Sequence, residues 1–146
     1  MRRFAPVKDA PSDTVLPKRG SKFSAGYDFY APKDIIVPAK GMSELVFMNV
    51  KAYMPSNEYL AVMIRSSLAV KYGLQVAQGI AVIDSDYVDN ESNDGNIGIC
   101  FVNNSDSDYV IEKGERCCQG VFCQYAVTCN DVAAGERRGG YGSTGK

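Results

Sequence analysis

The chain has 146 residues, and its 45% hydrophobic and 23% charged side chains are ordinary values for a single globular domain. These values exclude a disordered chain, a collagen-like repeat and a coiled coil. Sixteen basic and seventeen acidic residues give a net charge of -1, so no overall field recruits nucleic acid or an anionic membrane surface. We therefore expect neither as a partner, and we expect any bound anion to be held by a local site.

The cysteines and the first residues indicate where the protein works. The chain has five cysteines, an odd number without a C-x-x-C pair, which favours free thiols in a reducing compartment. The apolar runs are too short to cross a bilayer, and Pro6 and Lys8 stand where a signal peptide would have an apolar region. We expect a cytoplasmic protein.

Short apolar or alternating runs, separated by turn residues, predict successive β-strands along most of the chain. The predicted strands lie at 34–37, 44–50, 58–64, 74–76, 79–83, 96–102, 109–111 and 119–127. Only residues 67–72, closed by Gly73, are typical of a helix, with Ser66 or Ser67 as the N-cap. About ten short strands and a single short helix predict an all-β sandwich or jelly roll.

The C-terminal segment differs from the rest of the chain. Residues 134–146 contain five glycines and almost no apolar side chains, so we expect a mobile tail. We divide the chain into one β domain, residues 1–136, and a C-terminal lid, residues 137–146. The lid spells the first part of a P-loop, but no predicted strand precedes it, and we reject that match. Its glycines, arginine and hydroxyls suit a cover over a phosphorylated ligand, although taken alone the segment is better explained as a disordered tail.

Two loops that follow strands concentrate polar residues. The chain has no histidine, so carboxylates, amides, hydroxyls or backbone groups must carry any chemistry. Arg65, Ser66 and Ser67 lead into the predicted helix, and a guanidinium, two hydroxyls and free N–H groups suit a phosphate. Asp84 ends an apolar strand, where a carboxylate suits a general base for water. Taken alone, the first loop is better explained as a helix cap and the second as a polar turn.

Dedicated metal sites are not expected. Asp84-Ser85-Asp86 resembles the start of a calcium loop, but Val88 and Gly95 stand where such a loop needs ligands. In a regular strand Cys117 and Cys118 point to opposite faces and do not share a metal ion. We expect most of the cysteines to be packed as small hydrophobic side chains.

Five segments in a fixed order resemble the motifs of the homotrimeric dUTP pyrophosphatases (dUTPases). The segments are Ser24–Phe29, Ile64–Leu68, Ala81–Tyr87, Gly114–Phe122 and Gly139–Gly145, which extend over most of the chain. The resemblance implies a dUTPase-like distorted jelly roll (β-clip) that hydrolyses dUTP to dUMP and pyrophosphate. It also implies Mg²⁺ as cofactor, held mainly by the substrate phosphates, and a homotrimer with active sites at subunit interfaces.

The resemblance further implies a role for each matching residue. Asp84 would orient a water for attack on the α-phosphorus, and Tyr87 would stack on the deoxyribose and leave no room for a 2′-hydroxyl. Asp28 would either lie near the magnesium ion, through water, or support Asp84 by hydrogen bonds. The other nucleoside-binding residues would be Gln78, Val82, Ile83, Gly98 and Tyr141, with Tyr141 covering the uracil. The phosphate-binding residues would be Arg65, Ser66, Ser67, Gln119, Arg137, Ser143 and Thr144, with Arg138 as an alternative to Arg137.

Two alternative functions remain compatible with the fold. A dCTP deaminase-like enzyme would share the arginine-serine motif, but it needs a proton shuttle for attack on the pyrimidine ring. The glycine-rich tail and the run from Ile83 to Tyr87 favour attack by water on dUTP. The second alternative is a dUTPase-fold protein that regulates a partner by binding it, and the polar residues kept in all five motifs argue against an inactive enzyme.

Overall fold

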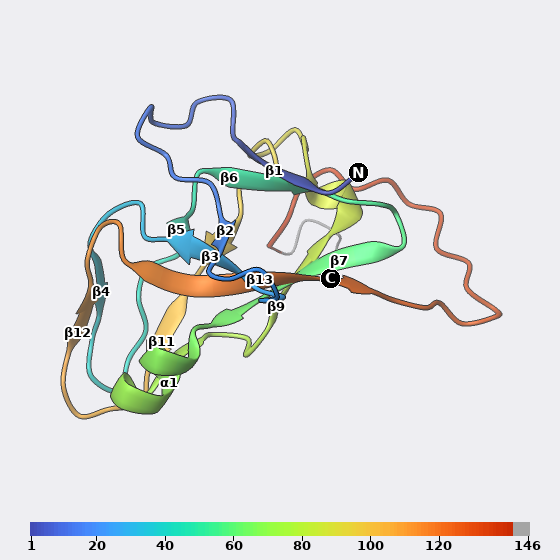
Figure 1. The fold of residues 1–146 in the computed structure, drawn as a ribbon. Coiled ribbons are helices and arrows are strands. Elements are labelled where there is room, and N and C mark those ends of the chain that lie inside the picture. The colour runs from blue at the N-terminus through green and yellow to red at the C-terminus, as the bar shows by residue number, and fades with distance from the viewer. Residues whose placement is uncertain (142–146) are drawn as a thin grey trace.

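A computed structural model describes residues 1–141 of the chain, and Figure 1 shows its fold. The described residues form thirteen strands, one α-helix and one short 3-10 helix. In chain order these are β1 (Arg3–Pro6), β2 (Lys18–Arg19), β3 (Tyr27–Tyr30), β4 (Ile35–Val37), β5 (Val46–Phe47), β6 (Val50–Tyr53), β7 (Glu58–Ile64), α1 (Ser66–Tyr72), β8 (Leu74–Val76), β9 (Ala81–Asp84), η1 (Ser85–Tyr87), β10 (Gly98–Ile99), β11 (Phe101–Asn103), β12 (Tyr109–Ile111) and β13 (Arg116–Gln124). The predicted all-β class with a single short helix is confirmed.

A five-stranded antiparallel sheet has the strand order β2-β3-β13-β7-β9. It pairs strands from the first part of the chain with β13, the last strand. Four two-stranded ladders, β1-β6, β5-β10, β8-β11 and β4-β12, complete the β structure of the described residues. Figure 1 shows β13 running through the middle of the molecule, with β1 and β6 above it and the β4-β12 pair at the left edge. These pairings between distant strands are typical of a jelly roll.

The core consists of apolar side chains on the inward faces of these strands. In β4, Ile35 and Val37 are buried and Ile36 between them is exposed, as the twofold alternation of a strand requires. Helix α1 buries only Leu68. Full burial of one such side chain contributes about 1.5–3 kcal/mol, so the many strands that each bury two or three of them stabilise the fold together.

The structure corrects several of the predicted strand boundaries. The predicted strand at 44–50 is two strands, β5 and β6, because Asn49 adopts a left-handed conformation with φ 59° and interrupts the pairing. The predicted strand at 96–102 is also two strands, β10 and β11. Strands β1, β2 and β3 are absent from the predicted strands, since none of the three is marked by an apolar or alternating run.

The predicted C-terminal end of helix α1 is confirmed, whereas its predicted N-cap is not. Gly73 closes the helix with φ 69°, and its N–H donates to the carbonyl oxygen of Ala69 at 3.0 Å, as predicted. The predicted N-cap is wrong, because Arg65 occupies the N-cap position without a side-chain hydrogen bond and Ser66 is already helical. The described residues contain no helix that is long and apolar enough to cross a membrane.

The two adjacent cysteines lie closer together than a regular strand allows. The pairing of β13 with β3 shifts register between Arg116 and Cys118, which is a β-bulge. Cys117 and Cys118 are therefore both fully buried, with their sulfur atoms 3.8 Å apart, and the predicted opposite orientation is wrong. All five cysteines are free, and packing of these two thiols in the core is confirmed.

Asn103 provides a test of a buried polar contact in this fold. Its amide donates to the carbonyls of Val37 at 3.0 Å and Ser107 at 2.8 Å, and its oxygen accepts from the N–H and the hydroxyl of Ser105. We expect Asn103→Ala to lower the free energy of unfolding by about 2–3 kcal/mol, because these partners lose a bond inside the protein. Urea denaturation measures the change. The exposed Asn104→Ala is the control, and an equal loss in both variants would contradict the prediction.

Candidate active site

The first of two polar clusters lies where β7 ends and α1 begins. Arg65 directly follows β7, and its Nε atom lies 3.0 Å from Oδ1 of Asp28 in β3. The guanidinium of Arg116 binds the other carboxylate oxygen at 3.2 Å. Asp28 is only 8% exposed, so the two arginines offset the cost of burying its charge and are themselves held in place. Arg116 lies in the fourth of the five motif segments, but the resemblance implies no role for it.

Gln119 joins this cluster from the central strand. In β13 it lies opposite Asp28 of β3 and Met63 of β7. A Cβ atom on Gly26 would lie 2.6 Å from the side-chain oxygen of Gln119, so the glycine makes room for that amide. Ser66 and Ser67 open helix α1 beside Arg65. The structure thus brings together five residues predicted for phosphate binding or its support: Asp28, Arg65, Ser66, Ser67 and Gln119.

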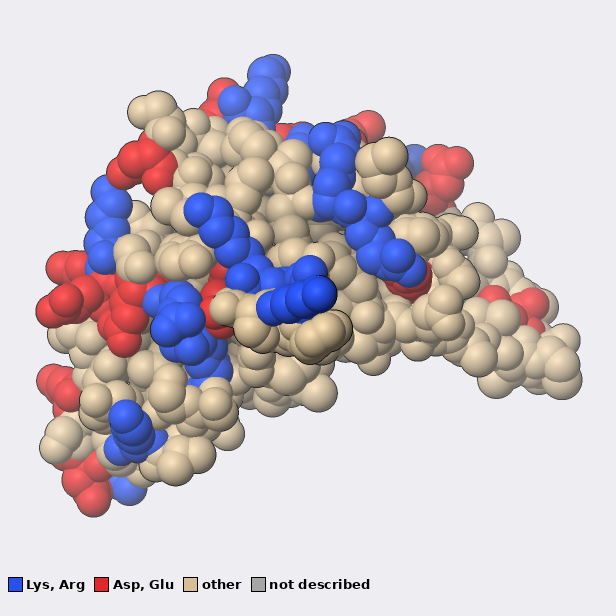
Figure 2. Space-filling view, viewed as in Figure 1, with Lys and Arg blue, Asp and Glu red and all other residues tan. Residues whose placement is uncertain are grey.

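Charge on this side of the molecule favours anions. Figure 2 shows basic side chains gathered over the middle of the face, where β2, β3 and β13 lie in Figure 1, and acidic side chains at the left edge. Strand β2 itself consists of Lys18 and Arg19 and pairs with β3, which carries Asp28. A local basic region on a chain of almost zero net charge is what the sequence analysis expected of an anion site.

The second cluster surrounds a cavity of about 170 Å³ beside β9. Its lining includes every residue predicted to bind the nucleoside, together with Asp84 and Arg137. The lining residues are Gln78, Ala81, Val82, Ile83, Asp84, Tyr87, Gly98, Arg137, Gly140 and Tyr141. Strand β9 is the edge strand of the central sheet, so the backbone groups on its outer side are free of strand partners and face this region.

The tail reaches this cavity within the same chain. The guanidinium of Arg137 binds Asp84 and also donates from Nε to Asp86 at 2.7 Å. The backbone of Gly140 packs against the ring of Tyr87, where an added Cβ would meet a ring carbon at 2.6 Å. Asp86 was not assigned a role from the sequence, and its contact with the tail joins residues 51 positions apart. Of the two alternative arginines, the structure places Arg137 at the site.

Tyr141 contacts the far side of the cavity. Its hydroxyl donates to the carbonyl oxygen of Gly98 at 2.8 Å, and its ring stands edge-on to Phe47. Burial of the hydroxyl raises the pKa of Tyr141, and the nearby Tyr87 raises it further, so the phenol stays protonated as a donor. Ser143 and Thr144, the other residues predicted in the lid, lie outside the described residues.

The two clusters lie far apart within one chain. Asp84 is paired with Tyr59 near the start of β7, whereas Arg65 follows the last residue of β7. Arg65 lies six positions after Tyr59 along the extended chain, which places their Cα atoms about 20 Å apart. Asp28 therefore does not support Asp84 inside one chain, and its oxygens bind the arginines of its own cluster.

The described residues do not build a metal cage. No group of three or more Asp, Glu or Cys side chains among residues 1–141 is arranged to hold a metal ion. Both oxygens of Asp28 already bind guanidinium groups. Such a donor set fits a magnesium ion that is bound by substrate phosphates and water rather than by the protein alone.

Comparison with known proteins decides between the candidate families. The sequence model of the dUTPase family matches residues 12–145. The chain belongs to the dUTPase family. The deoxyuridine 5′-triphosphate nucleotidohydrolase of Lactococcus lactis is 42% identical over 132 residues, which cover 89% of this chain and 87% of that protein. The rice enzyme of the same name is 36% identical over 145 residues, covering 95% of this chain and 79% of that protein.

Solved dUTPase structures share the fold of this chain. The crystal structure of the dUTPase from Streptococcus mutans matches with a TM-score of 0.78 and 37% identity, and the match covers 86% of this chain and 97% of that one. A mutant dUTPase from phage phi11 of S. aureus matches with a TM-score of 0.72 at 16% identity, over 94% of this chain and 97% of that one. The dUTPase-like jelly roll expected from the five motifs is confirmed.

Proposed function

We propose that the chain hydrolyses dUTP to dUMP and pyrophosphate in active sites built by more than one subunit. The observation that carries this proposal is the cavity beside β9, in which Asp84 lies among all the residues expected to bind the nucleoside. Family membership and relatives named deoxyuridine 5′-triphosphate nucleotidohydrolase support the same activity. Family membership also removes the dCTP deaminase-like alternative, and no contact in the described residues favours a regulatory binding role.

In the proposed reaction Asp84 acts on water. Its side chain is 49% exposed at the end of β9, so a water molecule can reach it beside a bound nucleotide. The carboxylate accepts a proton from the water as the water oxygen bonds to the α-phosphorus. The bond from that phosphorus to the bridging oxygen breaks, and pyrophosphate leaves on the opposite side.

The negative charge of the leaving group is held by the first cluster. Arg65, Ser66, Ser67 and Gln119 offer a guanidinium, hydroxyls and an amide to the phosphates, and charge-assisted hydrogen bonds of this kind are the strong ones. Magnesium bound to the triphosphate oxygens would neutralise part of the charge that develops on the pyrophosphate. Asp28 keeps Arg65 oriented toward the substrate through their ion pair.

The nucleoside is recognised by backbone hydrogen-bonding groups and by one aromatic ring. Uracil presents two carbonyl oxygens and one N–H group along one edge, which complement the free backbone edge of β9 at Val82 and Ile83 and the carbonyl of Gly98. Tyr87 is 6% exposed and its ring forms a wall of the cavity, which leaves little room for the extra hydroxyl of a ribonucleotide. Tyr141 must release Gly98 if that carbonyl is to accept from the base.

The tail, residues 137–146, acts as a lid in this proposal. Arg137 exchanges Asp84 and Asp86 for the γ-phosphate, which frees Asp84 to bind the attacking water. Ser143 and Thr144 would add hydroxyl donors to the same phosphate. Closure of the lid excludes bulk water from the reacting atoms and holds the triphosphate in line.

The separation of the two clusters supports a site shared between subunits, as in the homotrimer that the dUTPase resemblance implies. A bound triphosphate cannot bridge about 20 Å along β7 while its α-phosphorus stays beside Asp84. One subunit must therefore supply Arg65 and Gln119, and a neighbouring subunit must supply Asp84. Threefold symmetry gives three equivalent sites of this kind.

We expect Asp84→Asn to fold and bind dUTP but to lose about 10²- to 10⁴-fold in kcat, because the amide cannot accept the proton of the attacking water. Release of pyrophosphate from dUTP measures kcat, and binding is measured with a non-hydrolysable analogue. Asp106→Asn, the same change at an exposed carboxylate, should leave kcat unchanged. Turnover near that of the original chain in Asp84→Asn would refute the role of Asp84.

Mixed subunits test the shared site. Asp84→Asn and Arg65→Ala proteins, each of low activity, are unfolded together in equal amounts and refolded. If each site takes Asp84 and Arg65 from different subunits, random assembly leaves about a quarter of the sites with both residues intact. Activity of the mixture should therefore exceed that of either variant refolded alone. A site contained in one chain predicts no recovery, even when light scattering shows trimers.

Gly26→Ala should raise KM for dUTP about tenfold, because the added methyl displaces the amide of Gln119 and removes one hydrogen bond to a phosphate. The melting temperature should fall little, since the clash involves the end of a flexible side chain. Gly135→Ala is the matched control, because a Cβ at that position meets nothing within 4 Å. An unchanged KM in Gly26→Ala would take Gln119 out of the phosphate site.

A further inference from the structure

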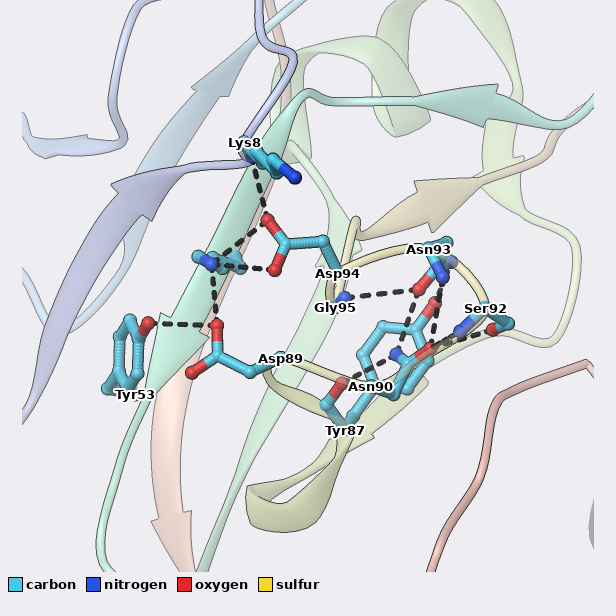
Figure 3. Close-up of polar contacts among 10 residues, drawn as sticks. Lys8, Tyr53, Tyr87, Asp89, Asn90, Ser92, Asn93, Asp94 and Gly95 are labelled. Carbon is cyan, nitrogen blue, oxygen red and sulfur yellow. Dashed lines mark hydrogen bonds and ion pairs between the residues drawn. The ribbon is translucent and has the colours of Figure 1, made fainter.

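Residues 88–96, which we term the Tyr87 loop, follow the aromatic wall of the nucleoside cavity. This loop contains no strand or helix, and its path relies on left-handed residues, Asp89 with φ 56°, Asp94 with φ 60° and Gly95 with φ 78°. A side chain at Gly95 would lie 2.7 Å from the Cα atom of Val88, so the loop folds tightly on itself. Figure 3 shows that the side chains of Asn90, Ser92 and Asn93 gather beside Tyr87, whereas Asp89 and Asp94 point away from it.

The Tyr87 loop holds both ends of Tyr87. The amide nitrogen of Asn93 donates to the hydroxyl of Tyr87 at 2.7 Å (Figure 3). That hydroxyl donates to the carbonyl of Asn96 at 3.0 Å. The amide of Asn90 donates to the backbone carbonyl of Tyr87 at 2.7 Å. Because both the hydroxyl and the backbone carbonyl of Tyr87 are bound, the ring has little freedom to tilt.

The direction of the Asn93 amide is fixed by its neighbours. Its oxygen accepts from the amide nitrogen of Asn90 at 2.8 Å and from the backbone N–H of Gly95 at 3.1 Å. Both partners are donors, so the amide nitrogen of Asn93 must be the atom that faces Tyr87. Asn90 is in turn held by three bonds to its oxygen, from the N–H and the hydroxyl of Ser92 and from the N–H of Asn93.

Two acidic residues attach the Tyr87 loop to the body of the protein. The ammonium group of Lys51 in β6 binds Asp89 at 2.5 Å and Asp94 at 2.9 Å. The hydroxyl of Tyr53 also donates to Asp89, and the backbone N–H of Lys8 donates to Asp94 at 2.7 Å (Figure 3). The loop is therefore fixed to β6 at two positions, one on each side of Asn90 and Asn93.

We propose that Asn93 is a positioning residue that sets the tilt of the Tyr87 ring and so determines how strongly the site rejects ribonucleotides. This inference rests on the proposed role of Tyr87 as the wall beside the deoxyribose. An added 2′-hydroxyl is excluded only while that wall cannot move. A ring whose hydroxyl is bound by both Asn93 and the Asn96 carbonyl stays in place, whereas a ring that has lost the bond from Asn93 can tilt away from an extra oxygen atom.

The experiment measures kcat/KM for dUTP and for UTP in four variants and the original chain. Asn93→Ala removes the donor, and Tyr87→Phe removes its acceptor while keeping the ring. Each should lower the ratio of dUTP to UTP efficiency about five- to tenfold, the effect of one hydrogen bond. The double variant should show no further loss than Tyr87→Phe, because that change already removes the bond from Asn93, together with the bond to the Asn96 carbonyl. The kcat for dUTP should change less than the ratio, since Asp84 is untouched.

A matched control separates positioning from general loosening of the loop. Ser92→Ala removes a bond within the loop, from the Ser92 hydroxyl to Asn90, and does not touch Tyr87. It should lower the melting temperature and leave the dUTP to UTP ratio unchanged. An unchanged ratio in Asn93→Ala or in Tyr87→Phe would overturn the inference, as would an equal loss in Ser92→Ala. If Asn93→Ala does not fold, Asn93→Leu, which keeps the size of the side chain without a donor, replaces it.

Tyr87→Ala distinguishes this inference from the function on which it rests. A ratio that falls in Tyr87→Ala but stays unchanged in Tyr87→Phe would leave the proposed wall intact and overturn the role of Asn93. A ratio that stays unchanged in Tyr87→Ala would refute the wall itself, and the inference with it. A fall in both tyrosine variants and in Asn93→Ala supports the positioning role.

Discussion

The register of β7 against its two neighbours is the constraint on which the arrangement of the site depends. Because β7 pairs antiparallel with both β9 and β13, Asp84 is fixed near one end of the strand and Gln119 near the other. A shift of register by two residues would move either by only about 7 Å, so small adjustments cannot join the clusters within one chain. In the proposed mechanism, association of subunits is therefore part of how the site is built.

Each cluster contains an ion pair between an arginine and an aspartate. The burial of the pair decides whether a bound substrate can replace one of the two partners. The side chains of Asp28 and Arg65 are 12% and 24% exposed, and removing one partner from such a pair leaves a charge that water reaches poorly. In the pair of Arg137 with Asp84 the carboxylate side chain is 49% exposed, so water can solvate Asp84 when Arg137 changes partners. A triphosphate, which carries several negative charges, competes well for Arg137. We therefore regard the first ion pair as a permanent scaffold and the second as exchangeable.

The sequence predicted what depends on local pattern and missed what depends on pairing. The bounds of β7 at 58–64 and the closure of α1 at Gly73 follow from an apolar run and from the backbone freedom of glycine. The left-handed Asn49 and the bulge at Cys117 depend on strands distant in sequence, and no local signal marks them. The resemblance located nearly every cavity residue. The contact of Arg137 with Asp84 and the distance from Asp84 to Arg65 are visible only in the folded structure.

The charges that anchor the Tyr87 loop also explain why its geometry holds at neutral pH. Hydrogen bonds from Lys51, and then from the backbone of Lys8, lower the pKa of Asp94, so their stabilisation is present above about pH 4 and is lost only as the pH falls through the lowered value. Burial alone would lower the pKa of Lys51, but its hydrogen bonds to Asp89 and Asp94 outweigh this and raise it. That contribution is fully present below about pH 10 and is lost only at higher pH. Between these limits the ion pair of Lys51 with Asp94 stays charged, so this attachment of the Tyr87 loop to β6 persists at neutral pH.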